Sequence, residues 1–159
     1  MAAKYDIEKL LTDLQTFLIA QLPAKLTAIT TEKGDSLTLA VPDSNAYFIQ
    51  TMNNKEAAYD PYVHIAAVDV ENVPARGALA KIYSVNIMIV LADEGTDTKI
   101  VNRMFRYLRA LEELFTENFA ATRPDVRLLV DSIVPVPLTE LGSGNFFKAT
   151  GVSMRVALA

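Results

Sequence analysis

Apolar residues recur along the chain at two spacings, one typical of helices and one typical of strands. Between Asp6 and Leu22 they are separated by four, three and four positions, which is one face of an amphipathic helix. Asp6 is suited to cap the start of this helix, and Pro23 predicts that it ends near Leu22. The apolar face consists of Ile7, Leu11, Leu14 and Leu18.

A second amphipathic pattern begins after the polar turn Asp93-Glu94-Gly95 and ends before Pro124. Its apolar residues are again three or four positions apart, so the pattern predicts a long helix that Thr96 or Asp97 caps. The apolar face of this second helix consists of Ile100, Met104, Leu108, Leu111, Phe115 and Phe119.

Strict alternation from Ala80 to Ala92 predicts a strand, because successive side chains of a strand point to opposite faces. We assign one face to the core, and the other becomes apolar at Met88, Val90 and Ala92. The residues of the core face are Tyr83, Val85, Ile87, Ile89 and Leu91.

Shorter alternating runs predict further strands, separated by segments rich in turn-forming residues. A hairpin is expected where the Lys33-Gly34-Asp35 turn joins two such runs. The expected strands cover 26–31, 37–41, 62–69, 126–136 and a terminal strand ending at 158, and the expected loops cover 43–60, 71–79 and the hairpin tip 137–144.

The order of these elements is helix, strands, helix, strands, which favours an α+β protein. We expect a single mixed, mainly antiparallel sheet of about four to six strands with two helices packed on one face. The sequence shows no internal repeat or linker, so residues 1–159 are expected to form a single α+β domain.

Composition removes several classes of site. The chain of 159 residues contains no Cys and one His. The absence of Cys excludes disulfides, thiolate metal sites and Cys nucleophiles.

The net charge of -4 argues against a surface that follows a nucleic-acid backbone. No near-apolar run approaches the roughly twenty residues that a membrane-spanning helix needs, and no secretory signal is visible. We therefore expect the chain to fold where it is made.

No catalytic, cofactor-binding or metal-binding residue is predicted. His64 lies on a strand face without a recognisable nucleophile or orienting carboxylate, so we interpret it as a strand residue rather than a general base. Asp93, Glu94 and Asp97 lack the spacing of a calcium loop and are better explained by helix capping. No glycine belongs to a dinucleotide-binding or phosphate-binding motif.

The charge order of the second helix is opposite to the one that the helix dipole favours. Two interpretations remain open: the cations pair with carboxylates across a subunit boundary, or the face is solvated and contains an Arg109–Glu113 pair. The cations are Lys99, Arg103, Arg106 and Arg109, and the acids are Glu112, Glu113 and Glu117.

The apolar second face at Met88 and Val90 also needs cover, either from the chain's own 43–60 segment or from a neighbouring copy. Tyr47, Phe48 and Leu138 lie in the segments 43–60 and 137–144, which lack a core period. We expect both segments to be partner-facing and weakly held in the isolated subunit.

Two segments carry a resemblance to a known family. Residues 83–95 (YSVNIMIVLADEG) followed by 103–113 (RMFRYLRALEE) are similar to the small neck and tail-completion proteins of long-tailed bacteriophages, particularly tail terminators. The resemblance implies a ring, commonly a homohexamer, that caps the tail tube, ends its polymerisation and joins it to the head connector. It implies no cofactor and no chemistry, and DNA would pass through the ring rather than bind to it.

The resemblance also implies a virion location after assembly in the host cytoplasm, with the tail tube protein and a head-connector or head-closure protein as partners. Two alternatives remain. One is another neck or tail role: a head-closure protein, a head-tail joining protein or a tail-tube-like subunit. The other is a small enzyme of unrecognised type, which predicts a deep polar pocket around His64 or Asp93.

Overall fold

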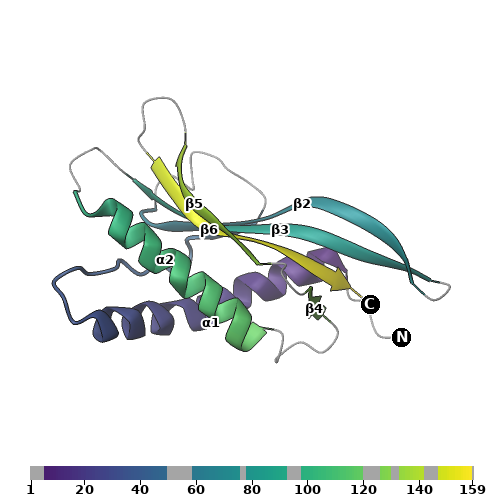
Figure 1. Cartoon of the computed structure of the whole chain (residues 1–159), viewed down its shortest axis with the longest axis horizontal. Helices are drawn as coiled ribbons and strands as arrows, with labels where there is room; N and C mark the ends of the chain where they lie inside the picture. The colour runs from purple at the N-terminus through teal and green to yellow at the C-terminus, as the bar shows by residue number, and fades with distance from the viewer. Residues whose placement is uncertain are drawn as a thin grey trace.

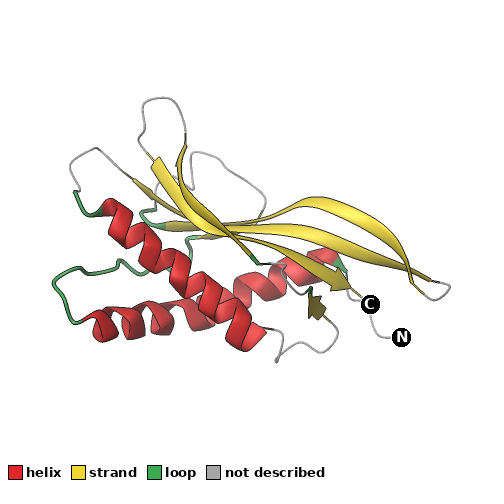
Figure 2. Cartoon of the chain, viewed as in Figure 1, coloured by secondary structure: helices red, strands yellow, loops and turns green. Residues whose placement is uncertain are grey.

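The computed structural model describes residues 6–49, 59–75, 78–92, 98–119, 126–129, 133–141 and 147–158. They form an α+β protein in which two helices lie on one side of a six-stranded open sheet (Figures 1 and 2). The elements are α1 (Ile7–Lys33), β1 (Tyr47–Ile49), β2 (Tyr62–Ala75), β3 (Ala78–Ala92), α2 (Ile100–Leu114), the short π-helix η2 (Phe115–Phe119), β4 (Val126–Leu128), β5 (Val134–Leu141) and β6 (Phe147–Leu158).

The sheet has the order β1-β2-β3-β6-β4, and β5 also pairs with β6. β1 runs parallel to β2, whereas the other pairs are antiparallel, so the sheet is mixed and mainly antiparallel as predicted. β4 and β5 occupy successive parts of one edge of β6, which corrects the continuous strand expected over 126–136.

One core joins both helices to one face of the sheet. Its strand residues lie in register: Val63 pairs with Ile89, and Ile87 pairs with Val152 on the next strand. The predicted core faces of β3, α2 and the terminal strand are confirmed, because their apolar residues are buried or packed against this cluster. On the terminal strand these residues are Val152, Met154, Val156 and Leu158.

α1 is longer than the sequence analysis predicted and contains Pro23 in its interior. A proline there costs a helix about 3 kcal/mol, because it removes one hydrogen bond and crowds the preceding turn. Burial of Leu26 and Ile29, each worth about 1.5–3 kcal/mol, offsets that cost. The strand expected over 26–31 is therefore wrong, and the hairpin expected there does not form.

Asp6 caps α1 as predicted, with its side chain accepting a hydrogen bond from the Lys9 N–H at 3.0 Å. Gly34 ends the helix in the left-handed conformation, with φ of 62°, so the expected turn is a helix C-cap. The segment after it is extended but belongs to no strand. Its alternating Leu37 and Leu39 are buried, and it runs along α2, where the Tyr107 hydroxyl donates to the Ala40 carbonyl at 2.6 Å.

The loop expected over 71–79 is also wrong, because β2 continues to Ala75 and β3 begins at Ala78, and these two residues pair. Pro74 is compatible with this strand because, among the described residues, β1 pairs with β2 only as far as Ile65. The tip 142–144 expected for the last hairpin lies outside the described residues, whereas 137–141 belongs to β5.

Candidate assembly surfaces

The basic residues of α2 have partners within the chain. Arg106 binds both carboxylate oxygens of Asp35, one of them at 3.0 Å, and donates to the Leu37 carbonyl at 3.2 Å. Arg103 donates to the Thr38 carbonyl. These contacts tie the first half of α2 to the segment that follows α1.

Arg109 joins the two helices through a fork of hydrogen bonds. Its two terminal nitrogens donate to the Glu32 carboxylate at 3.0 and 2.6 Å, and its Nε donates to Glu113 Oε1 at 2.7 Å. Lys25 completes the network, with its ammonium 2.6 Å from Glu113 and 3.3 Å from Glu117. The expected Arg109–Glu113 pair is therefore present, and α1 supplies the charges that compensate the reversed order on α2.

These ion pairs lower the pKa values of their carboxylates. The Arg106 guanidinium lowers the pKa of Asp35 from its ordinary value of 3.8 to about 2. Arg109 lowers the pKa of Glu32, and Lys25 followed by Arg109 lowers the pKa of Glu113. The Glu113 carboxylate in turn raises the pKa of Lys25. The carboxylates of Asp35, Glu32 and Glu113 are therefore ionised at neutral pH.

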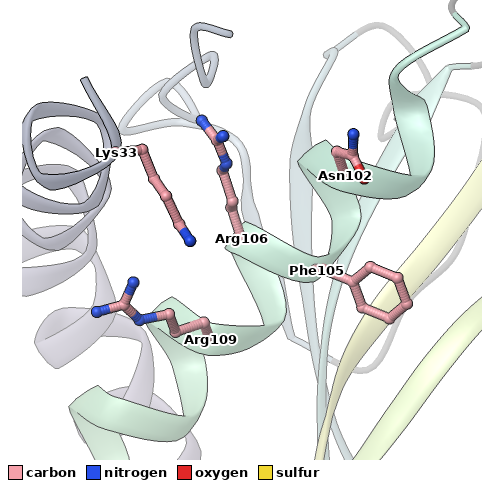
Figure 3. A pocket seen from close by; sticks show the side chains of 5 residues that line it. All are labelled: Lys33, Asn102, Phe105, Arg106 and Arg109. Atoms are coloured by element: carbon pink, nitrogen blue, oxygen red, sulfur yellow. The ribbon is translucent and has the colours of Figure 1, made fainter. Parts of the chain in front are cut away.

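A hollow of about 280 Å³ lies beside this network, and Figure 3 shows the side chains that line it. Lys33 extends from the end of α1 toward Arg106 and Arg109, whereas Phe105 points to another side of α2. Three of the side chains that line it are cationic, and none is an imidazole or a carboxylate. Its lining residues are Lys33, Asn102, Phe105, Arg106 and Arg109.

The outer face of α2 carries two exposed apolar side chains that the sequence analysis did not select. Phe105 is 54% exposed and Val101 is 41% exposed, and the i, i+4 spacing puts them side by side. Glu112 is half-buried on the same helix, and its backbone carbonyl accepts a hydrogen bond from the Thr116 hydroxyl at 2.8 Å.

A second exposed apolar pair lies on β2, beyond the residues that pair with β1. Val68 is 56% exposed and Val70 is 48% exposed. The carboxylate of Asp69 accepts a hydrogen bond from the Val70 N–H at 2.8 Å. The sequence analysis included Val68 in its expected strand without selecting it, and it ended that strand at Asp69, before Val70.

The apolar end of β3's other face is covered by the described residues of the chain's own 43–60 segment, which is one of the two sources considered. Val90 is buried with Ala46, and the half-buried Met88 packs against the same cluster. The ring of Phe48 lies 5.7 Å from that of Tyr59. The full cluster is Ala46, Tyr62, Val90 and Ala149, with Phe48, Tyr59, Met88 and Phe147 packed against it.

Tyr47 faces the other way and belongs to the main core. Its phenol has no hydrogen-bond partner in the described part of the chain, and burial raises its pKa to about 12. Tyr47 therefore offers no outer surface in this subunit. Leu138 lies in β5, and its side chain is outside the described residues.

The residues weighed for chemistry are not brought together. His64 is half-buried on β2, in register with Phe48 and Met88. Asp93, Glu94 and Asp97 lie outside the described residues. Within the described ranges, no group of three or more His, Cys, Asp or Glu side chains is placed to hold a metal ion. None of the described helices is long and apolar enough to cross a membrane.

The chain has a structural likeness to a solved virion particle, whereas its sequence matches neither a family model nor a curated protein. A chain from a solved structure titled "Virion of native gene transfer agent (GTA) particle" superposes with a TM-score of 0.44 and 12% sequence identity. The match covers 89% of this chain and 93% of that one. At this TM-score the likeness carries no argument about function, and the class that the structure itself defines is an open-sheet α+β protein.

Proposed function

We propose that this chain is a virion structural protein of the neck of a long-tailed bacteriophage, where a ring of copies caps the tail tube, ends its polymerisation and joins it to the head connector. The proposal starts from the sequence resemblance over 83–95 and 103–113. The described parts of those segments belong to β3 and α2, which share the main core.

The observation that carries the proposal is the presence of two separate exposed apolar pairs. Val68 and Val70 lie on β2, and Val101 and Phe105 lie on α2. A ring needs a heterologous contact, in which one surface of a subunit meets a different surface of the next. Two distinct apolar surfaces on one subunit supply that requirement, whereas a single patch would favour a two-fold dimer.

The alternative of a small enzyme receives no support from the described residues. A proton-transfer site needs a base with a tuned pKa beside a second reactive group in a concave pocket. The hollow at α2 is lined by neither His64 nor a carboxylate. We therefore assign His64 no chemical role and leave the site without cofactor or metal.

Electron microscopy of particles made without this protein tests the proposal. Overlong tails are expected if the chain ends tube polymerisation, and the wild-type chain supplied in trans should restore normal length. Full heads without tails would instead indicate a head-tail joining role. Normal, infectious particles would exclude a neck function. A stable His64→Ala variant should restore particles as well as the wild type does.

A further inference from the structure

The hollow beside α2 brings cationic side chains of two helices together (Figure 3). Its lining residues on α2 lie on one face of that helix, because neighbours among them are at most three or four positions apart. They are Asn102, Phe105, Arg106 and Arg109. Lys33, in the last turn of α1, completes the lining, and its side chain extends toward the two guanidiniums. The lining therefore combines three cations, one amide and one aromatic ring.

The two arginines of this hollow keep hydrogen-bond donors that the described part of the chain does not use. Arg106 makes three hydrogen bonds, to Asp35 and to a backbone carbonyl. Arg109 also makes three, to Glu32 and Glu113. A guanidinium has more N–H groups than that, so each arginine retains donors for a ligand. The carboxylates also hold the guanidiniums in place, and the Arg106 side chain is only 11% exposed.

Lys33 is the lining cation whose charge is least compensated. It forms no hydrogen bond or ion pair with any described residue, whereas both arginines bind carboxylates. Its charge does reach a neighbour, because Arg109 and, more weakly, Lys33 lower the pKa of Glu32. An ammonium that extends toward two guanidiniums is repelled by them, and an anion in the hollow would offset this repulsion.

The carboxylates around these cations limit how much negative charge the hollow accepts. Glu32 and Asp35 each pair with one of its guanidiniums. Glu113 is shared between a guanidinium and the Lys25 ammonium, and Glu112 lies on the next turn of α2. These acids would repel the successive phosphates of a nucleic acid, since like charges placed together oppose binding. A single carboxylate matches the one lining cation that has no carboxylate partner.

We propose that this hollow binds an acidic side chain of a partner protein, with the carboxylate accepting hydrogen bonds from Lys33 and Arg109 and an adjacent apolar side chain packing on Phe105. The volume of about 280 Å³ is just below the roughly 300–1,000 Å³ of pockets that enclose small molecules, so it suits one or two side chains. Phe105 is 54% exposed, and its ring points away from the cations, so the apolar contact lies beside the charged one. The proposal rests on the proposed function in taking the partner to be a neighbouring protein of the assembly, and it adds the chemical group that this partner must present.

Two synthetic peptides test the site on the full chain. Acetyl-Gly-Glu-Leu-Gly-amide presents one carboxylate beside an apolar side chain, and its counterpart has glutamine in place of glutamate. In NMR titrations, the backbone signals of Asn102 and Phe105 should shift with the glutamate peptide, which should bind about fivefold more tightly than the glutamine peptide. That factor corresponds to about 1 kcal/mol, the upper end for a partly exposed ion pair.

Lysine variants separate the hollow from the overall charge of the chain. Lys33→Gln should remove most of the fivefold preference without changing the melting temperature, because Lys33 makes no hydrogen bond or ion pair with the described residues. Lys81→Gln is the matched control, since it removes the same charge at an exposed position of β3, which does not line the hollow. It should leave the preference unchanged.

Equal affinity for the two peptides, or no shift with either at the highest soluble concentration, would overturn the proposal. An equal loss of preference in both lysine variants would assign the effect to overall charge and would also overturn it. A thymidine tetranucleotide that moves the Asn102 and Phe105 signals at lower concentration than the glutamate peptide would overturn it in favour of a nucleic-acid contact. None of these results would remove the neck role, which particles made without this protein test separately.

Discussion

Gly151 on β6 lies so close to Ile87 on β3 that a Cβ atom at position 151 would be 1.9 Å from the Ile87 carbonyl oxygen. The same atom would also lie 2.8 Å from the Ile87 carbonyl carbon and from the Met88 Cα. These are backbone atoms of a central strand, so they cannot move aside as a flexible side chain would. The close approach of β3 and β6 therefore requires glycine at this position.

Gly151→Ala should destabilise the protein by about 3 kcal/mol, the upper end for an overpacked core, because the two strands must separate to admit the methyl group. Gly34→Ala is the matched control: the position is open, with the nearest atom 4.0 Å away, but its φ of 62° is unfavourable for alanine. That change should cost only about 1–2 kcal/mol. Urea unfolding measures both, and a Gly151→Ala variant as stable as Gly34→Ala would contradict the close packing.

Leu26, a buried residue of α1, tests the helical continuation past Pro23. Leu26→Ala should lower the free energy of unfolding by about 2–5 kcal/mol, because it leaves a cavity in the main core. The neighbouring Thr27 is exposed and bonds only to the Pro23 carbonyl, so Thr27→Ala should change stability by less than about 0.5 kcal/mol. Similar losses in both variants would contradict the burial that we assign.

The sequence was sufficient for elements whose apolar period agrees with their environment. β3 and α2 follow this rule: Val85 and Ile87 alternate toward the helices, and Met104 and Leu111 follow the helical period. Each of these elements has one face on the core, so the apolar period in its sequence correctly predicts which residues are buried. The open α+β arrangement with helices on one face followed from the order of these elements.

The sequence failed where tertiary burial overrides a local signal. Pro23 marks a helix end in isolation, but the core beneath Leu26 and Ile29 stabilises the continuation. Leu37 and Leu39 alternate as in a strand, yet their extended segment is held by Arg103 and other side chains of α2. The continuation of α1 past Pro23 and the extended segment both depend on α1 and α2 lying side by side, which the sequence alone does not show.

The same limit applies to the candidate assembly surfaces. Sequence reasoning selected the charged residues of α2 because their order opposes the helix dipole. Their partners include Glu32 and Asp35, which are distant in the sequence and adjacent in space. Phe105 follows no pattern that distinguishes an exposed ring from a buried one, so only the structure identifies it as surface.

The Arg106–Asp35 pair predicts a stability loss in acid. The folded pKa of Asp35 is about 2, below its ordinary value, so its contribution is present above about pH 4 and is lost as the pH falls toward 2. Asp35→Asn should lower stability at neutral pH and flatten the decline between these pH values. Arg106→Gln should produce the same flattening, and the double variant should add little, as urea unfolding across this range would show. Additive effects of the two changes would contradict their pairing.

Removing the hydroxyl from each of two buried tyrosines should change the free energy of unfolding in opposite directions. The Tyr47 hydroxyl has no hydrogen-bond partner among the described residues, so Tyr47→Phe should raise the free energy of unfolding by about 1 kcal/mol. The Tyr107 hydroxyl donates to the Ala40 carbonyl at 2.6 Å, so Tyr107→Phe should lower it by about 1–2 kcal/mol. Urea unfolding measures the free energy of unfolding of both variants, and light scattering measures the self-association of Tyr47→Phe. If Tyr47→Phe self-associated more weakly and gained no stability, Tyr47 would belong to the subunit interface and not only to the core.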